Sequence, residues 1–143
     1  MNRTERFAEF LQRREEASTA FVNGEFAPLD ELSTRQSPAT IFGPSGDTVE
    51  GASEVSSVNA AGAARFAAGS TNSFQIMHFA SDGEIGYWAG IQHSVVHMNG
   101  QDQPIPMDLR VTEIFRHEDD GWKLVHRHAD QLDRELVQAS NDE

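Results

Sequence analysis

The stretch Leu109–Asp130, LRVTEIFRHEDDGWKLVHRHAD, decides the fold of this 143-residue chain. Two runs of alternating apolar and polar residues flank Asp120-Gly121, a dipeptide typical of the tight turn in a β-hairpin. Strict alternation puts five residues of the second run on one face: Trp122, Leu124, His126, His128 and Asp130. We therefore expect a closing hairpin in which two imidazoles lie beside an apolar wall.

The second half of the chain continues this alternation upstream. Four runs have it, namely Ser73–Ala80, Ile85–Met98, Met107–Arg116 and Trp122–Ala129. The connections between them contain Asp-Gly or Asn-Gly, which favour the positive backbone angles of two-residue hairpin turns. The pattern predicts a four-stranded antiparallel meander.

The first half has helical spacing instead. One apolar stripe, interrupted by an arginine, contains Phe7, Phe10, Leu11, Arg14, Ala17 and Phe21. Gly24 suits the position that follows the end of this helix. A short helix near Pro28, a strand at Ala39–Phe42 and an Ala-rich helix over Ala52–Ala68 follow. Helices first and strands last predict an α+β fold, with the helices gathered on one face of a bent antiparallel sheet that encloses a hollow.

Composition narrows the class of protein. The formal net charge of −12 argues against binding to nucleic acid or to anionic membranes. The absence of cysteine excludes disulfides, thiol nucleophiles and Cys-ligated metals. The charged N-terminal residues do not resemble a secretory signal, so we expect a cytoplasmic protein. We expect one domain over residues 1–131 and an acidic, frayed tail over 132–143.

Three motifs resemble those of the NTF2-like (ketosteroid isomerase-like) superfamily, and of its SnoaL-like or DUF4440-like members in particular. They are Asn23-Gly24-Glu25, the strand Ile41–Pro44 that leads to Gly51, and Arg110–Thr112 with Gly121–His128. The last motif is also similar to the closing hairpin of the calmodulin-dependent kinase association domain. The resemblance covers Glu5 to about Asp130 and implies a cone of three helices on a strongly curved sheet. It implies no single activity, because the superfamily includes isomerases, dehydratases, cyclases, binding modules and assembly domains.

Ketosteroid isomerases of this superfamily carry a catalytic aspartate just before the proline that ends the first strand, where this chain has Gly43. They also use a tyrosine from the first helix, whereas Tyr87 is the only tyrosine here. The resemblance therefore does not extend to isomerase chemistry at these two positions. Asp47 is the nearest alternative acid, although a turn or cap role is the simpler interpretation.

The residues most suited to chemistry are His126 and His128. They fit a polar pocket wall, a structural hydrogen-bond network, a general acid–base pair or a metal site. A metal site would need a third ligand, such as His93, His97 or Asp130, and we predict neither a metal nor a cofactor.

Other residues are candidates for ligand binding. Arg110, which shares a strand face with Thr112, could hold a carboxylate or form a surface ion pair. On the long central strand we expect Trp88 and Gln92 to face the hollow, and the opposite face, with Tyr87, His93 and His97, to pack against a second subunit. The predicted ligand-binding set is Trp88, Gln92, Arg110, Thr112, His126, His128, Phe21 and Phe42.

The favoured function is the binding of a small, partly apolar or carboxylate-bearing molecule by a homodimer. One alternative is a cofactor-independent isomerase or cyclase that moves a proton on a carbonyl compound, with His126 or Asp47 as the base. The other is an oligomerisation module.

Overall fold

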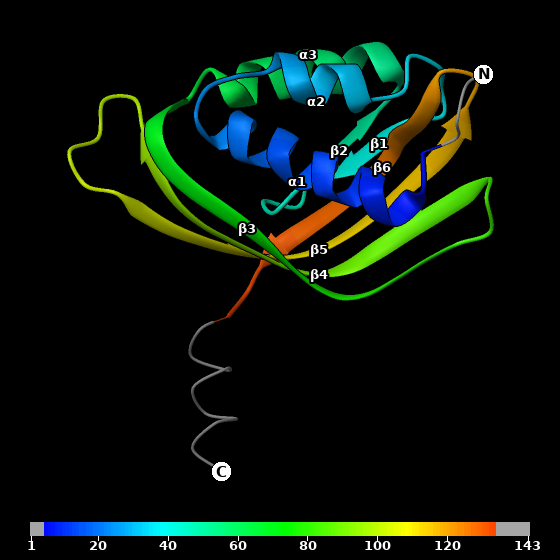
Figure 1. Ribbon diagram of the computed structural model, residues 1–143. Helices are drawn as coiled ribbons and strands as arrows, with labels where there is room; N and C mark the ends of the chain where they lie inside the picture. Colours follow the sequence, from blue (N-terminus) through cyan, green and yellow to red (C-terminus); the bar gives the residue numbers. More distant parts are fainter. Residues whose placement is uncertain (1–4, 134–143) are drawn as a thin grey trace.

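The computed structural model describes residues 5–133, and within them three helices cover one face of a curved six-stranded sheet (Figure 1). The helices are α1 (Phe7–Val22), α2 (Ala27–Leu32) and α3 (Ala52–Ala63). The strands are β1 (Thr40–Phe42), β2 (Thr48–Glu50), β3 (Phe66–Ser81), β4 (Ile85–Met98), β5 (Ile105–Glu118) and β6 (Gly121–Gln131). This confirms the predicted α+β class, with three helices on a curved and mainly antiparallel sheet.

The sheet has the order β2-β1-β6-β5-β4-β3. Its strands β3 to β6 form the predicted antiparallel meander, while β1 pairs in parallel with β6 and antiparallel with β2. The strand β2 was not predicted. It has three residues at the edge of the sheet, too few for alternation to distinguish it from the preceding loop.

One predicted boundary is wrong. The third helix ends at Ala63 instead of Ala68, and β3 begins at Phe66, which pairs with Met98. Residues 64–68 are alanine-rich and favour a helix by intrinsic propensity. Pairing with β4 overrides that preference, and so the first strand of the meander starts seven residues before the predicted Ser73.

Glycines at two positions shape the cone. Gly24 ends α1 with φ +94°, as predicted, and a Cβ atom there would lie 2.9 Å from the carbonyl oxygen of Phe66. In β4, a Cβ atom on Gly90 would collide with the backbone of Gln75 in β3. The close approach at Gly90 lies beside an irregularity in β3 between Ile76 and His78, where the pairing register shifts. Bulges of this kind bend a strand, and the curvature produces the hollow over which the helices lie.

The solid core fills one end of the hollow. There α1 places Phe7 and Phe10 against Phe115 and Trp122 of the closing hairpin, with ring centroids 4.9 Å apart for Phe7 and Trp122 and 5.1 Å for Phe10 and Phe115. Trp122 also donates from Nε1 to the Glu5 carbonyl oxygen. Aromatic pairs at these distances stabilise a core beyond their buried area. The second half of α1 borders the part of the hollow that this core does not fill.

None of the helices within residues 5–133 is both long and apolar enough to cross a bilayer. Residues 134–143, most of the predicted tail, lie outside the described part of the chain, and the division into a domain and a tail stays a prediction.

Candidate functional site

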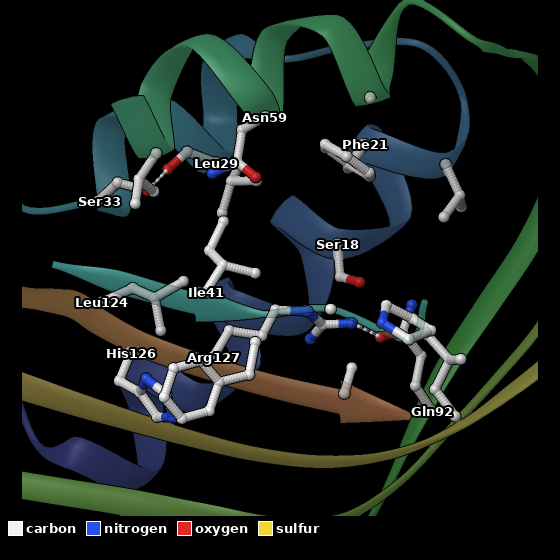
Figure 2. A pocket seen from close by; sticks show the side chains of 18 of the residues that line it. Ser18, Phe21, Leu29, Ser33, Ile41, Asn59, Gln92, Leu124, His126 and Arg127 are labelled. Carbon is white, nitrogen blue, oxygen red and sulfur yellow. Dashed lines mark hydrogen bonds between the residues drawn. The ribbon is translucent and has the colours of Figure 1, made fainter. Parts of the chain in front are cut away.

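A cavity of about 320 Å³ occupies the end of the hollow that the aromatic core leaves open. Its walls come from the second half of α1, from α2 and α3, and from strands β1, β4, β5 and β6 (Figure 2). Most of the surface is apolar, with Phe21, Leu29, Ile41, Val55, Leu124 and Met107 among the lining residues. Figure 2 shows Ile41 and Leu124 projecting toward α3 across the open space. A mainly apolar cavity with a few polar groups is the usual form of a small-molecule site.

The polar groups gather around a buried carboxylate, Glu113 of β5. Arg14 of α1 binds Glu113 through two hydrogen bonds, from Nε to Oε1 at 3.0 Å and from Nη2 to Oε2 at 2.8 Å. Arg127 of β6 donates from Nη1 to Oε2 at 2.8 Å, and Trp88 of β4 donates from Nε1 to Oε1 at 2.8 Å. Four donors from a helix and two strands thus converge on one carboxylate. We call Arg14, Glu113 and Arg127 the charged triad.

The triad keeps Glu113 ionised. Burial alone would raise the pKa of this carboxyl group, but the charges of Arg14 and Arg127 and their hydrogen bonds outweigh burial and lower the pKa to about 2. Burial also lowers the pKa of Arg127, an effect that the charge of Glu113 opposes. Since an arginine remains protonated in proteins, all three groups are charged at neutral pH.

Both arginines of the triad line the cavity, and so do Gln92 and Ser18. Arg127 donates from Nη2 to Gln92 Oε1 at 2.7 Å, a contact drawn in Figure 2, and Gln92 donates from Nε2 to Asn72 Oδ1 at 2.9 Å. Ser18 projects from α1 toward the same end of the cavity (Figure 2). One end of the cavity is therefore polar and the rest is apolar.

The histidines of the closing hairpin do not lie beside Trp122 as predicted, because β6 contains a bulge. Leu124 pairs with Phe115, whereas His126 pairs with Ile114, so that Val125 is an extra residue on β6. The bulge reverses the alternation, and Arg127 and Ala129 follow Leu124 on the helix-covered face. His126 and His128 consequently share the opposite face with Arg110 and Thr112.

On that opposite, outer face of the sheet, Arg110 forms an ion pair with Asp130. Its Nε and Nη2 atoms donate to the two carboxylate oxygens at 2.6 and 2.7 Å. The side chains are 62% and 36% exposed. The surface ion pair is therefore the alternative that the structure contains. Together with Thr112 and His128 these two residues border a shallow groove, separate from the cavity.

His126 lies where β1 meets β6, on the border of the cavity. Its Nδ1 atom is 2.7 Å from the Thr40 hydroxyl oxygen, and its ring packs edge-on against Phe42 at a centroid distance of 4.8 Å. Burial and the nearby charge of His128 lower the pKa of His126, while the charge of Glu113 opposes this shift. Within residues 5–133, no three histidine, aspartate or glutamate side chains are grouped closely enough to hold a metal ion.

Residues 12–132 match the SnoaL-like domain family, which is most of the chain. The chain belongs to the SnoaL-like domain family. No functionally curated protein matches it in sequence.

Solved structures similar to this SnoaL-like domain have several roles in their names. A candidate dehydratase of the NTF2-like family from Streptomyces avermitilis is 20% identical, with a TM-score of 0.69, over 87% of this chain and 97% of that one. A candidate ketosteroid isomerase from Parabacteroides distasonis is 16% identical, with a TM-score of 0.65, over 91% of each chain. The CaMKII hub homology domain of Chlamydomonas reinhardtii is 22% identical, with a TM-score of 0.66, over 88% and 98%. At these identities the likeness shows the fold alone.

The SnoaL-like cavity brings together only part of the predicted ligand-binding set. Phe21, Phe42, Gln92 and His126 border it. Arg110, Thr112 and His128 lie on the outer groove, and Trp88 is fully buried under the charged triad. Gln92 and Trp88 lie on the helix-covered face of β4, as expected, while His93 is exposed on the other face. The ligand-binding roles themselves stay predictions.

Asp47, the predicted alternative acid, lies in the turn between β1 and β2. It is exposed and accepts a hydrogen bond from Ser45 Oγ at 2.8 Å, so a turn contact is present. A Cβ atom built on Gly43 would overlap the Asp47 carboxylate, whose Cγ atom lies 2.9 Å away. The carboxylate of Asp47 thus occupies the space that a side chain at position 43 would need.

None of the three members of the triad was among the site residues predicted from the sequence. A signal exists for two of them, since Arg14 interrupts the apolar stripe of α1 and Glu113 interrupts the inward series Leu109, Val111, Phe115. Opposite charges at two positions that should be buried indicate an internal ion pair. Arg127 has no such signal, because only the bulge at Val125 turns it inward.

Proposed function

We propose that this SnoaL-like domain binds a small, mainly apolar molecule in the cavity between its helices and its sheet. The observation that carries the proposal is the division of the cavity into apolar walls and one polar end at Arg127 and Gln92. Apolar walls supply affinity by removing ligand surface from water, and a few polar groups at one end fix the orientation of the ligand.

A thermal-shift screen of small apolar compounds tests this function, because a ligand that binds only the native state raises the melting temperature in proportion to its concentration over its affinity. The substitution Ile41→Trp should plug the cavity and abolish the shifts. Ile105→Trp, at an exposed position on β5, is the matched control and should retain them. Shifts that persist in the plugged variant would place the binding site elsewhere.

A second candidate function is proton transfer on a carbonyl compound, with Asp47 or His126 as the base. The position of the Asp47 carboxylate in the space of a residue-43 side chain favours it. We expect such an activity to appear as exchange of α-hydrogens of a probe ketone, cyclohexanone, in deuterated water, followed by NMR. Exchange at the uncatalysed rate, or exchange unaffected by both Asp47→Asn and His126→Ala, would contradict this function.

We further propose that two copies associate through the outer face of the sheet. Met77 of β3 is 66% exposed there and borders the groove that contains Arg110 and His128. Exposed apolar surface of this kind is typical of protein interfaces. We expect a dimer in sedimentation at micromolar concentration and its dissociation by Met77→Asp. A monomeric wild type would contradict both the dimer and the alternative of an association module.

A further inference from the structure

The hydrogen-bonding inventory at the polar end of the cavity is unbalanced. Both oxygens of Glu113 are already used, Oε1 by Arg14 and Trp88 and Oε2 by Arg14 and Arg127. The Oε1 atom of Gln92 is used by Arg127. Each acceptor oxygen of these side chains therefore already accepts at least one hydrogen bond.

Hydrogen-bond donors of the two arginines, in contrast, remain available to a ligand. Arg14 Nη1 is buried and has no hydrogen-bond partner among residues 5–133. Arg127 has five N–H groups, of which the contacts to Glu113 and Gln92 use two. Its side chain is 19% exposed although it lies on the covered face of the sheet. Unpaired buried donors are rare in native proteins, and a water molecule, an ion or a ligand would supply the acceptor that Arg14 Nη1 lacks.

The net charge at the polar end of the cavity also favours a ligand with hydrogen-bond acceptors. Two guanidinium groups face one carboxylate, which gives the triad a net charge of +1. In a chain whose overall charge is −12, a buried positive centre at the end of a cavity is a local exception. Because the surroundings are apolar, this charge is screened less than it would be on the surface, and it favours an anionic group beside it.

We propose that the ligand of this cavity is a monocarboxylate, with its carboxylate at Arg127 and Arg14 and its hydrocarbon body against the apolar wall. The inference rests on the proposed binding function and adds the chemical class of the ligand. A planar carboxylate accepts from guanidinium N–H groups in pairs, and its single charge balances the triad. The hydrocarbon chain or ring then extends along Leu29, Ile41 and Leu124, which line the cavity.

The test uses four probes with the same hydrocarbon chain and different head groups: octanoate, octanamide, octan-1-ol and octylamine. Affinities for the wild-type protein are measured by isothermal titration calorimetry at pH 7.5. We expect octanoate to bind at least about tenfold more tightly than octan-1-ol, because hydrogen bonds to charged groups contribute more than neutral ones. Octylamine should bind most weakly, because its ammonium group would lie beside two guanidinium groups.

Two variants assign the preference to Arg127. Arg127→Met should remove the tenfold advantage of octanoate over octan-1-ol. Arg110→Met removes the same charge from the outer face, where the arginine is 62% exposed, and should leave both affinities unchanged. If Arg127→Met does not fold, Arg127→Lys replaces it. That variant keeps the charge and loses the planar pair of donors, so it should weaken the binding of octanoate more than that of octan-1-ol.

The outcomes separate the two proposals. Binding of octan-1-ol and octanoate with equal affinity, or a preference for octanoate that survives Arg127→Met and Arg127→Lys, would overturn the carboxylate inference and leave the binding function standing. Failure of all four probes to bind, with no compound active in the thermal-shift screen, would overturn the binding function itself. Loss of the preference in Arg110→Met would move the carboxylate site to the outer groove.

Discussion

Each face of the sheet carries an arginine–carboxylate ion pair, and the two pairs differ in their exposure to water. On the covered face, Arg14 binds Glu113 through two hydrogen bonds with side chains that are 3% and 0% exposed. On the outer face, Arg110 binds Asp130 through two bonds of similar length with side chains that are 62% and 36% exposed. The two pairs therefore have similar hydrogen-bond geometry and differ in solvation. Water solvates the charges of the outer pair when they separate, whereas the charges of the inner pair are shielded from water.

Removing the carboxylate should have the largest effect and should differ between the faces. We expect Glu113→Ala to lower the free energy of unfolding by about 3–5 kcal/mol, since the buried Arg14, the largely buried Arg127 and the Trp88 N–H would lose their acceptor. Asp130→Ala is the matched change on the outer face and should leave stability within experimental error. Urea unfolding, followed by tryptophan fluorescence, measures both.

The triple variant Arg14→Met, Glu113→Leu, Arg127→Met sharpens this comparison. It removes the charges together and leaves no unpaired ion in the core, so it should be more stable than Glu113→Ala. Equal destabilisation by Glu113→Ala and Asp130→Ala would show that the buried triad is solvated, contrary to the structure.

The pH dependence of stability should come next in size. The pKa of Glu113 falls from its ordinary 4.5 to about 2 on folding. Between these values the unfolded chain binds a proton that the folded chain does not, so the free energy of unfolding falls as the pH falls from 4.5 toward 2. Each unit of pKa difference corresponds to about 1.4 kcal/mol, which predicts a loss of about 3 kcal/mol from this group.

The variant Glu113→Gln isolates that contribution, because its amide does not titrate. Its stability, measured by urea unfolding at pH 5 and pH 3, should fall less over this interval than that of the wild type. Asp130→Asn, on the exposed pair, should follow the wild-type curve closely. Parallel curves for Glu113→Gln and the wild type would contradict the lowered pKa of Glu113.

A conservative substitution should divide the two faces more finely. Arg14→Lys keeps the charge and replaces a planar fork by a single ammonium group, so one of the two hydrogen bonds to Glu113 is lost. We expect a cost of about 1–3 kcal/mol, the usual value for a hydrogen bond to a charged group. Arg110→Lys should show no measurable change. Thermal unfolding of the two variants side by side makes the comparison, and similar melting temperatures would argue against a bidentate requirement in the core.

Several features of the sheet could be predicted from the sequence. The hairpin turns and alternating runs predicted the meander, because Asp-Gly and Asn-Gly turns and period-two alternation are local signals. These features depend on residues close together in the chain. Alternation alone did not decide which face of β4 the helices cover. Trp88 and Gln92 were expected on that face because the opposite face suited a subunit interface, and the structure has them there.

The candidate site depended on one residue that alternation does not reveal. The extra residue Val125 shifts β6 by one position relative to β5, which turns Arg127 inward and His128 outward. A shift of one residue moves every later side chain of a strand to the other face. The predicted pair of histidines was therefore placed with the wrong neighbours, although each residue was assigned to the correct strand. The bulge arises from pairing between strands, and single-strand patterns do not contain that information.

The smallest predicted effect concerns His126, which lies at the border between the two faces. Burial and the charge of His128 lower its pKa, so it should titrate below the ordinary value for histidine in an NMR pH titration. Replacing His128 by Gln removes one of the two causes and should raise the pKa of His126. His117→Gln is the matched control, because His117 packs against Trp122 at the other end of β6. Two results would contradict this prediction: an unchanged pKa of His126 in His128→Gln, or a wild-type pKa of His126 at or above the ordinary value. Either result would show that the two rings, which both contact Phe42 in the structure, do not interact as described.

With the expected lowered pKa, His126 is neutral at pH 7, and its Nδ1 atom is held by the Thr40 hydroxyl. The positive charge that faces the cavity then belongs to the arginines of the triad and not to the histidines of the hairpin.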